Sequence, residues 1–168
     1  MSKLKSLEDL FEHQLKDLYS AEKQALQAMP KMMETIQDPG LKKAFETHLE
    51  ETKEQKVRLE KVCELVGISP GRMTCKAMRG LIEESEEAIA EDAIPEVKDA
   101  ALIAAAQRME HYEIAGYGTA AHYAERLGQQ EAAELLSQTL KEEQKTDTVL
   151  NKLAKSYINK KAEKPQAE

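Results

Sequence analysis

Apolar residues recur every three or four positions through most of the chain, and this spacing is the feature that most restricts its fold. A helix of 3.6 residues per turn brings such positions onto one face, whereas a half-buried strand alternates at every second residue. The pattern predicts four long helices and no strand. Their approximate ranges are 6–38, 41–66, 96–127 and 130–159.

Glycine and proline separate the predicted helices. Asp38-Pro39-Gly40 ends the first helix, Gly67 the second and Gly128 the third, because glycine readily takes the left-handed conformation that follows a helix end. Pro30 lies inside the first helix, where it removes a backbone donor, so we expect a bend or a loosened turn there. The short first turn makes the first two helices antiparallel neighbours.

A shorter amphipathic segment at about 74–91 lies between the second and third long helices. The irregular residues 68–73 precede it and a turn at 92–95 comes after it, so we expect it to cross the bundle. The chain is thus predicted to be all-α, a four-helix bundle with one crossover and a short extra helix between helices two and three. Its 168 residues suffice for one domain over residues 1–162, with a disordered polar tail at 163–168.

Composition restricts the location and the partners of the protein. The formal net charge is -7 and the basic residues are scattered, which argues against binding to nucleic acid. No apolar run reaches the roughly 18 residues of a membrane span, and residues 1–10 are too charged for a signal peptide. We therefore expect a cytoplasmic protein that binds neither nucleic acid nor membranes. Cys63 and Cys75 are expected to be reduced, although they could meet across a turn.

Near its middle, each long helix replaces the hydrophobic residues of its inward stripe by polar ones. The ionisable residues in these interruptions are Glu22, His48, Glu51, Glu110, Glu113, Glu143 and Asp147. Thr52 and Thr146 are the alternatives to Glu51 and Asp147 at the inward positions. None of these positions is Lys or Arg, so we expect six carboxylates and one imidazole to converge without a cation from the protein.

A cluster of buried carboxylates must take up protons, admit water or hold a metal ion, because an unpaired buried charge is costly. A metal explains the arrangement most economically. Oxygen-rich ligands with at most one imidazole and no thiolate suit iron or manganese better than a structural zinc. Carboxylates could bridge two such divalent ions, since six acids would oppose roughly four to six positive charges.

Five segments of the chain carry a resemblance to a known family: YSAEKQ (19–24), HLEET (48–52), GLIEE (80–84), DAALIAAAQRMEHYEIAGYGT (99–119) and EEQKTD (142–147). They resemble the bacterial YciE/YciF stress-response proteins of the ferritin-like superfamily. The resemblance runs from Leu7 to about Ala162. It implies a ferritin-like bundle with a metal site in its core and a role in the response to stress.

Ferritin-like proteins place one carboxylate on each of the first and third long helices and a Glu-x-x-His pair on each of the second and fourth. By position, the four glutamates of this pattern match Glu22, Glu110, Glu51 and Glu143. Both histidines are absent. Helix two has the reversed order His48-x-x-Glu51, and helix four offers Asp147. The family's redox enzymes tune their irons with those imidazoles, whereas metal binding itself survives the change.

Three further residue sets have two interpretations. His48 either binds the metal directly or hydrogen-bonds Glu51 or Glu22 beside it. Tyr117 either donates to a metal-binding carboxylate or simply packs in the core. His111 and His122 lie on another face of helix three, which is typical of a surface or a dimer interface.

These patterns support two hypotheses on function. The first is a cytoplasmic protein with a dinuclear iron or manganese centre, in which any reaction would be metal-centred oxidation or peroxide removal. Its expected ligands are Glu22, Glu51, Glu110 and Glu143, with Glu113, Asp147 and His48 as the next candidates. The second is a non-catalytic structural or interaction protein, acting as a homodimer, whose acidic core holds water or binds metal weakly.

Overall fold

The computed structural model describes residues 4–163, and within this range the chain is helical without any strand. The helices are α1 (Leu7–Thr35), α2 (Pro39–Leu65), α3 (Lys76–Ala90), α4 (Pro95–Arg126) and α5 (Gln130–Leu153), followed by a π-helical turn (Ala154–Ile158) and α6 (Asn159–Ala162). The all-α prediction is thereby confirmed for the described part. Apart from Glu163, the predicted tail at 163–168 lies outside it.

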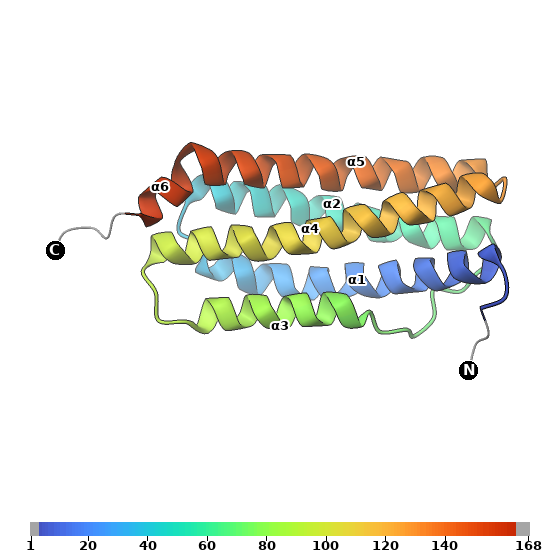
Figure 1. Cartoon of the computed structure of the whole chain (residues 1–168), viewed down its shortest axis with the longest axis horizontal. Helices are drawn as coiled ribbons and strands as arrows, with labels where there is room; N and C mark the ends of the chain where they lie inside the picture. The colour runs from blue at the N-terminus through green and yellow to red at the C-terminus, as the bar shows by residue number, and fades with distance from the viewer. Residues whose placement is uncertain (1–3, 164–168) are drawn as a thin grey trace.

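Four of the helices, α1, α2, α4 and α5, form a bundle in which each contacts two others. Helix α1 packs against α2 and α4, and α5 packs against the same two helices. The short helix α3 lies outside this bundle and packs along α1 and α4. Because α3 leads the chain back along the bundle, α4 starts near the end where α2 starts, and α2 and α4 run in the same direction (Figure 1). Although these helices are long, none of the described ones combines the length and hydrophobicity that a membrane span requires.

The helix ends have the chemistry that the sequence predicts. The Ser6 hydroxyl accepts from the Asp9 amide at 3.2 Å while the Asp9 carboxylate accepts from the Ser6 amide at 3.1 Å, which satisfies two amides of the first turn of α1. Gly67 and Gly128 come after α2 and α4 with φ of 71°. Helix α2 begins at Pro39, two residues earlier than predicted, because proline fits the first turn of a helix.

The last long helix differs from the prediction, which placed one helix over 130–159. Helix α5 ends at Leu153, and a π-helical turn spans Ala154–Ile158. A π turn accommodates an extra residue and shifts the register of the residues after it. Near the end of this turn, the Tyr157 hydroxyl donates to Asp38 Oδ1 at 2.5 Å and so ties this end of the chain to the start of α2.

Two apolar clusters fill the bundle, one towards each end. One includes Met29, Phe45, Leu102 and Leu150, and the other includes Leu15, Leu59, Tyr117 and Leu136. Cys75 belongs to the first and Cys63 to the second, and both are free thiols. Buried polar residues of all four long helices separate the two clusters: Glu22, His48, Thr52, Gln55, Glu110, Glu113, Glu143 and Thr146. We call this set the polar layer.

Candidate metal centre

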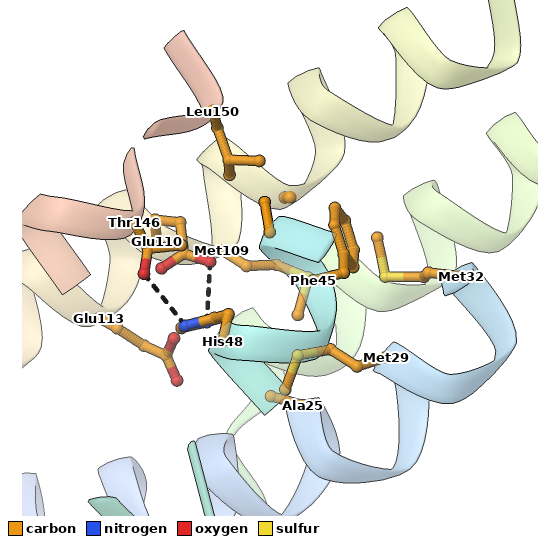
Figure 2. Close-up of a pocket in the computed structure, with 12 residues that line it drawn as sticks. Ala25, Met29, Met32, Phe45, His48, Met109, Glu110, Glu113, Thr146 and Leu150 are labelled. Atoms are coloured by element: carbon orange, nitrogen blue, oxygen red, sulfur yellow. Dashed lines mark hydrogen bonds and ion pairs between the residues drawn. The ribbon is translucent and has the colours of Figure 1, made fainter. Parts of the chain in front are cut away.

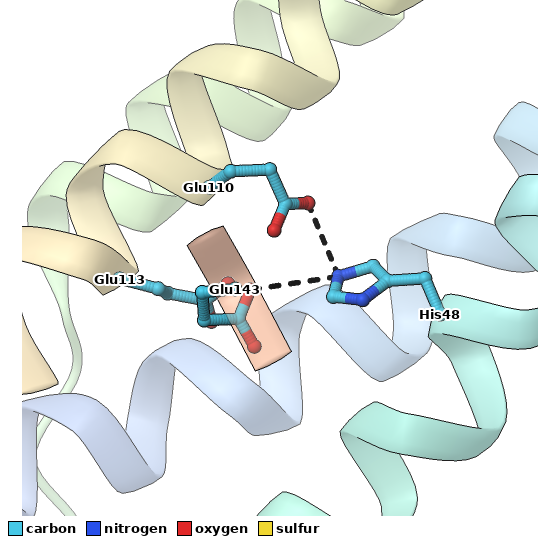
Figure 3. Close-up of side chains that lie close together, drawn as sticks. All are labelled: His48, Glu110, Glu113 and Glu143. Carbon is cyan, nitrogen blue, oxygen red and sulfur yellow. Dashed lines mark ion pairs between the residues drawn. The ribbon is translucent and has the colours of Figure 1, made fainter. Parts of the chain in front are cut away.

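Four members of the polar layer form a compact group. His48 of α2, Glu110 and Glu113 of α4, and Glu143 of α5 are all buried, and each offers one potential ligand atom within 4.8 Å of those of the others (Figure 3). Three helices therefore direct three carboxylates and one imidazole at a common point. The arrangement satisfies the basic geometric requirement of a metal site, which is several donor atoms within reach of one ion.

His48 is held by contacts on both ring nitrogens. Nε2 lies 3.1 Å from Glu110 Oε1 and 3.8 Å from Glu143 Oε2. On the other side, Nδ1 lies 3.2 Å from the Thr146 hydroxyl and 3.9 Å from Glu51 Oε2. Nε2 consequently faces the carboxylates, and Thr146 orients the ring from behind in the manner of outer partners of metal-bound histidines.

Glu22 of α1 extends the group from the fourth helix. Its side chain has no solvent exposure, and the Tyr117 hydroxyl of α4 donates to its Oε1 atom. Of the two interpretations of Tyr117, the structure thus supports donation to a carboxylate. Oε2 of Glu22 has no hydrogen-bond partner, so one oxygen of this carboxylate is available for a further ligand.

Several buried oxygens of the layer lack a hydrogen-bond partner. Within residues 4–163 they are Glu22 Oε2, Gln55 Oε1, Glu110 Oε2, Glu113 Oε1 and both carboxylate oxygens of Glu143. In the same range, no Lys or Arg forms an ion pair with any of the four glutamates. A buried polar atom without a partner costs on the order of 1–3 kcal/mol. Several such atoms lie in one place, and the group of His48, Glu110, Glu113 and Glu143 could hold a metal ion.

Burial changes the protonation of the carboxylates. It raises the pKa of Glu22 to about 7 against the opposing hydrogen bond from Tyr117. Burial, together with the charges of neighbouring glutamates, also raises the pKa of both Glu113 and Glu143 well above the usual range. These acids are difficult to ionise in the protein alone, and a nearby cation would reverse this effect.

His48 and Glu110 behave oppositely because they face each other. Burial alone would lower the pKa of His48, but the Glu110 carboxylate raises it well above the usual value. For Glu110, burial alone would raise the pKa, but the positive charge of His48 lowers it. The two side chains therefore form an ion pair that compensates one of the negative charges of the layer.

Glu51 and Asp147 do not join the group, so the prediction that six carboxylates converge is wrong for these two. Glu51 is half-buried at the edge, with Lys145 Nζ 3.2 Å from its Oε1. Asp147 lies 3.0 Å from Gln107 Nε2 and 3.2 Å from His111 Nε2. Each has found a partner outside the layer.

Helix geometry explains this outcome. The buried positions of α2 repeat at alternating steps of four and three residues: Leu41, Phe45, His48, Thr52, Gln55, Leu59 and Val62. The continuous inward face therefore passes through Thr52, and Glu51 lies about 100° away around the helix. On α5 the same rule selects Thr146 over Asp147. His111 and His122 are exposed, as predicted.

Gln55 is the residue of the layer that the sequence-based prediction missed. Gln55 lies in the interrupted stripe of helix two, but only ionisable residues were selected as candidate ligands, and its amide is neutral. Its side chain has no solvent exposure, and Nε2 donates to Glu142 Oε2 at 3.1 Å while Oε1 lacks a partner. It is thus a further oxygen donor without a partner in the polar layer.

One side of the group borders an apolar pocket. Met29 and Met32 of α1, Phe45 of α2 and Met109 of α4 line it, while His48, Glu110 and Glu113 form its polar end (Figure 2). The carboxylates behind these hydrophobic walls are almost fully buried. Exclusion of water strengthens every electrostatic interaction in the layer.

The chain is similar to known proteins over most of its length. Residues 6–163 match the family model described as "Domain of unknown function (DUF892)". Protein YciF of Escherichia coli (strain K12) is 51% identical over 161 residues, which are 95% of this chain and 97% of YciF. The resemblance to YciF-like stress proteins is thereby confirmed.

Solved structures extend the similarity to three dimensions. The crystal structure of the E. coli stress protein YciF matches with a TM-score of 0.90 at 50% identity, covering 94% of this chain and 99% of that one. The structure of YcfI from Rhodopseudomonas palustris matches with a TM-score of 0.86 at 42% identity, covering 89% and 95%. Near-complete coverage on both sides means that the chain matches these proteins over their whole length.

Proposed function

This chain belongs to the DUF892 family, and we propose that its polar layer binds two divalent metal ions, iron or manganese, in the core of a ferritin-like bundle. The observation that carries the proposal is the set of buried carboxylate oxygens without partners, contributed by α1, α4 and α5. Helices α2 and α4 run in the same direction, and α3 lies in the connection between them (Figure 1). Parallel helices need such a long crossover, and one crossover between two pairs of long helices is the ferritin-like topology.

The donor set fits this pair of ions. Glu110, Glu113, Glu143 and Glu22 would hold them together with His48 Nε2. Four carboxylates carry four negative charges, and two divalent ions carry four positive ones, so the loaded layer is neutral with a neutral imidazole. Carboxylate oxygens with a single imidazole suit iron and manganese. Glu51 and Asp147 remain predicted ligands only if they release Lys145 and His111.

The similarity to a stress protein favours a protective role. We propose that the protein acts in the bacterial stress response, as a cytoplasmic homodimer. When bound, iron or manganese would supply oxidation of substrates or removal of peroxide. The residues of the polar layer would hold the ions away from bulk water, and the Tyr117 hydroxyl donates its proton in a hydrogen bond to Glu22.

Metal analysis of the purified protein tests this proposal. After exposure to Fe²⁺ or Mn²⁺ and removal of loose metal, we expect about two ions per chain and a higher melting temperature, because a ligand that binds only the folded state stabilises it. Elemental analysis and thermal unfolding provide the two readouts. Protein that stays metal-free, with an unchanged melting temperature, would contradict the proposal.

The second candidate is a structural or interaction protein whose acidic core works without metal. The contact between His48 and Glu110 favours it, because this ion pair neutralises one carboxylate from within the chain. Burial also favours the protonated forms of Glu113 and Glu143. In that case, replacing Glu143 by Gln would leave the function in the cell intact, whereas a metal-dependent function would be lost.

A further inference from the structure

We propose that Gln55 is a metal ligand through its Oε1 atom, so that the two ions occupy unlike sites. One site is built around His48 and the other around Gln55 and Glu22, with carboxylates of α4 and α5 shared between them. This inference rests on the proposed function, and it assigns a role to a residue that lies outside the familiar carboxylate and histidine pattern.

The orientation of the Gln55 amide is fixed by its neighbour. Glu142 is held by Arg58, whose two terminal nitrogens lie 2.8 and 3.0 Å from its carboxylate oxygens. An ionised carboxylate only accepts hydrogen bonds, so the NH₂ group of Gln55 must be the end that faces Glu142, at 3.1 Å. The carbonyl oxygen Oε1 therefore points away from Glu142, and it has no partner although the side chain is fully buried.

The register of the helices places Gln55 at the level of Glu22. Helices α2 and α4 run in the same direction (Figure 1), and His48 of α2 contacts Glu110 of α4 at 3.1 Å. Seven residues further along each helix, which is two turns, stand Gln55 and Tyr117. Because Tyr117 donates to Glu22, the three side chains share one level of the bundle.

The general direction of helical side chains leads us to expect Gln55 to lean towards the other site. Helical side chains lean towards the N-terminus of their helix, which for Gln55 is the direction of His48. Gln55 Oε1 and Glu22 Oε2 are thus two oxygens without partners in one part of the layer.

An amide oxygen in this position has a specific chemical consequence. It is a hard donor like a carboxylate but adds no charge. The site at Gln55 is therefore built of oxygen alone, whereas the site at His48 contains one nitrogen. Because imidazole favours the later transition metals and oxygen donors suit manganese, we expect the two ions to bind with different affinities, the Gln55 site being the weaker for iron.

Binding of Mn²⁺ to single variants tests the assignment. In Gln55→Leu the ion of the Gln55 site should bind more than about tenfold more weakly, while the ion beside His48 is unaffected. At a Mn²⁺ concentration that fills both sites of the wild type, electron paramagnetic resonance should then change from the spectrum of a coupled pair to that of isolated Mn²⁺. Gln55→Glu should restore two ions with the second bound more tightly than in the wild type. The matched control is Gln107→Leu, which removes an amide bonded to Asp147 outside the layer and should keep both ions.

The outcomes separate this inference from the proposed function. Wild-type protein that binds two ions, together with a Gln55→Leu variant that binds them equally well, would overturn the role of Gln55 alone. Wild-type protein that binds no ion would overturn both. Should Gln55→Leu fail to fold, Gln55→Glu decides the question, because an unchanged second affinity in that variant contradicts direct ligation.

Discussion

The chain buries two groups of acids, one at an end of the bundle and one in its middle, and they are completed in different ways. At the end, Asp99 Oδ1 and Oδ2 accept from the amides of Gln37 and Asp38 at 3.0 and 2.8 Å. Asp38 in turn accepts from the Leu41 amide at 3.0 Å, from Tyr157 and from Lys161 at 3.1 Å. Every carboxylate oxygen of this end cluster has a donor from the protein.

The polar layer in the middle lacks such donors. Neither oxygen of Glu143 has a hydrogen-bond partner, although Oε2 lies 3.8 Å from His48 Nε2, and Glu22, Glu110 and Glu113 each have one buried oxygen without a hydrogen-bond partner. Buried acids that the chain itself satisfies stabilise the fold, whereas acids that it leaves unsatisfied require something from outside. The contrast teaches that the chain itself satisfies the acids of the end cluster, whereas the polar layer could accommodate a cation, as we propose.

The largest expected contrast concerns metal affinity. Replacing Glu143 by Gln removes a charged donor without changing its size, so we expect the affinity for iron or manganese to fall more than about a hundredfold. Isothermal titration of metal into the variant measures this. Glu134→Gln, an exposed change on the same helix, serves as the control and should bind normally. An equal loss in both variants would remove the distinction between the layer and the surface.

The end cluster should respond in stability rather than in metal binding. Asp99→Ala leaves the amides of Gln37 and Asp38 without their acceptor, so we expect unfolding to become easier by about 2–4 kcal/mol. Urea unfolding of metal-free protein gives this value, and the number of bound metal ions should not change. A variant as stable as the wild type would show that water replaces the carboxylate without cost.

Metal-free Glu143→Gln should show the reverse. Because burial disfavours the charge of Glu143, its removal should change stability by less than about 1 kcal/mol or even increase it. Unfolding in the presence of a chelator measures the difference. A loss as large as that of Asp99→Ala would mean that Glu143 stabilises the fold by itself.

An effect smaller than that of Asp99→Ala is expected for Tyr157, whose hydroxyl is one of several donors to Asp38. Tyr157→Phe should cost about 1 kcal/mol. The hydrogen bond to Asp38 raises the pKa of Tyr157 to about 12. In a spectrophotometric titration, Tyr157→Phe should therefore show one fewer tyrosine with a raised pKa than the wild type. An unchanged titration would show that the contact does not persist in solution.

The smallest contrast depends on pH. Burial favours the neutral form of Asp38, but hydrogen bonds from Tyr157, the Leu41 amide and Lys161 outweigh it and hold the pKa below its usual value. Ionised Asp38 thus adds stability above the unfolded-state pKa of about 3.9, and this is lost as the pH falls through the folded-state value. Asp38→Asn should therefore cost stability at about pH 6 and much less at about pH 2. A pH-independent cost would argue that the charge does not matter.

Much of the fold could be predicted from periodicity and from helix-end residues. The stripes of α1 and α4 and the glycines after α2 and α4 are local signals, and apart from the end of α5 they located each long helix to within a few residues. The π-helical turn after Leu153 was not predicted; Tyr157 within it contacts Asp38, which lies far away in the sequence. Long-range partners of this kind leave no local pattern.

The site residues could be predicted where they follow the repeat of three and four residues that marks the inward face of each helix. Glu22, His48, Glu110, Glu113 and Glu143 lie in the layer as expected. The errors at Glu51 and Asp147 arose because residues one position apart differ by about 100° around a helix, and acidic residues were preferred over Thr52 and Thr146. Counting charges instead of keeping to the strict repeat caused this error, and the same preference concealed Gln55.

Anomalous scattering from crystals grown with Fe²⁺ and with Mn²⁺, recorded at the absorption edge of each metal, tests the central claim most directly. We predict two neighbouring peaks in the polar layer, one beside His48 and Glu110 and the other beside Glu22 and Gln55. Well-ordered crystals with no peak in the layer, or with metal only on the surface, would contradict the account.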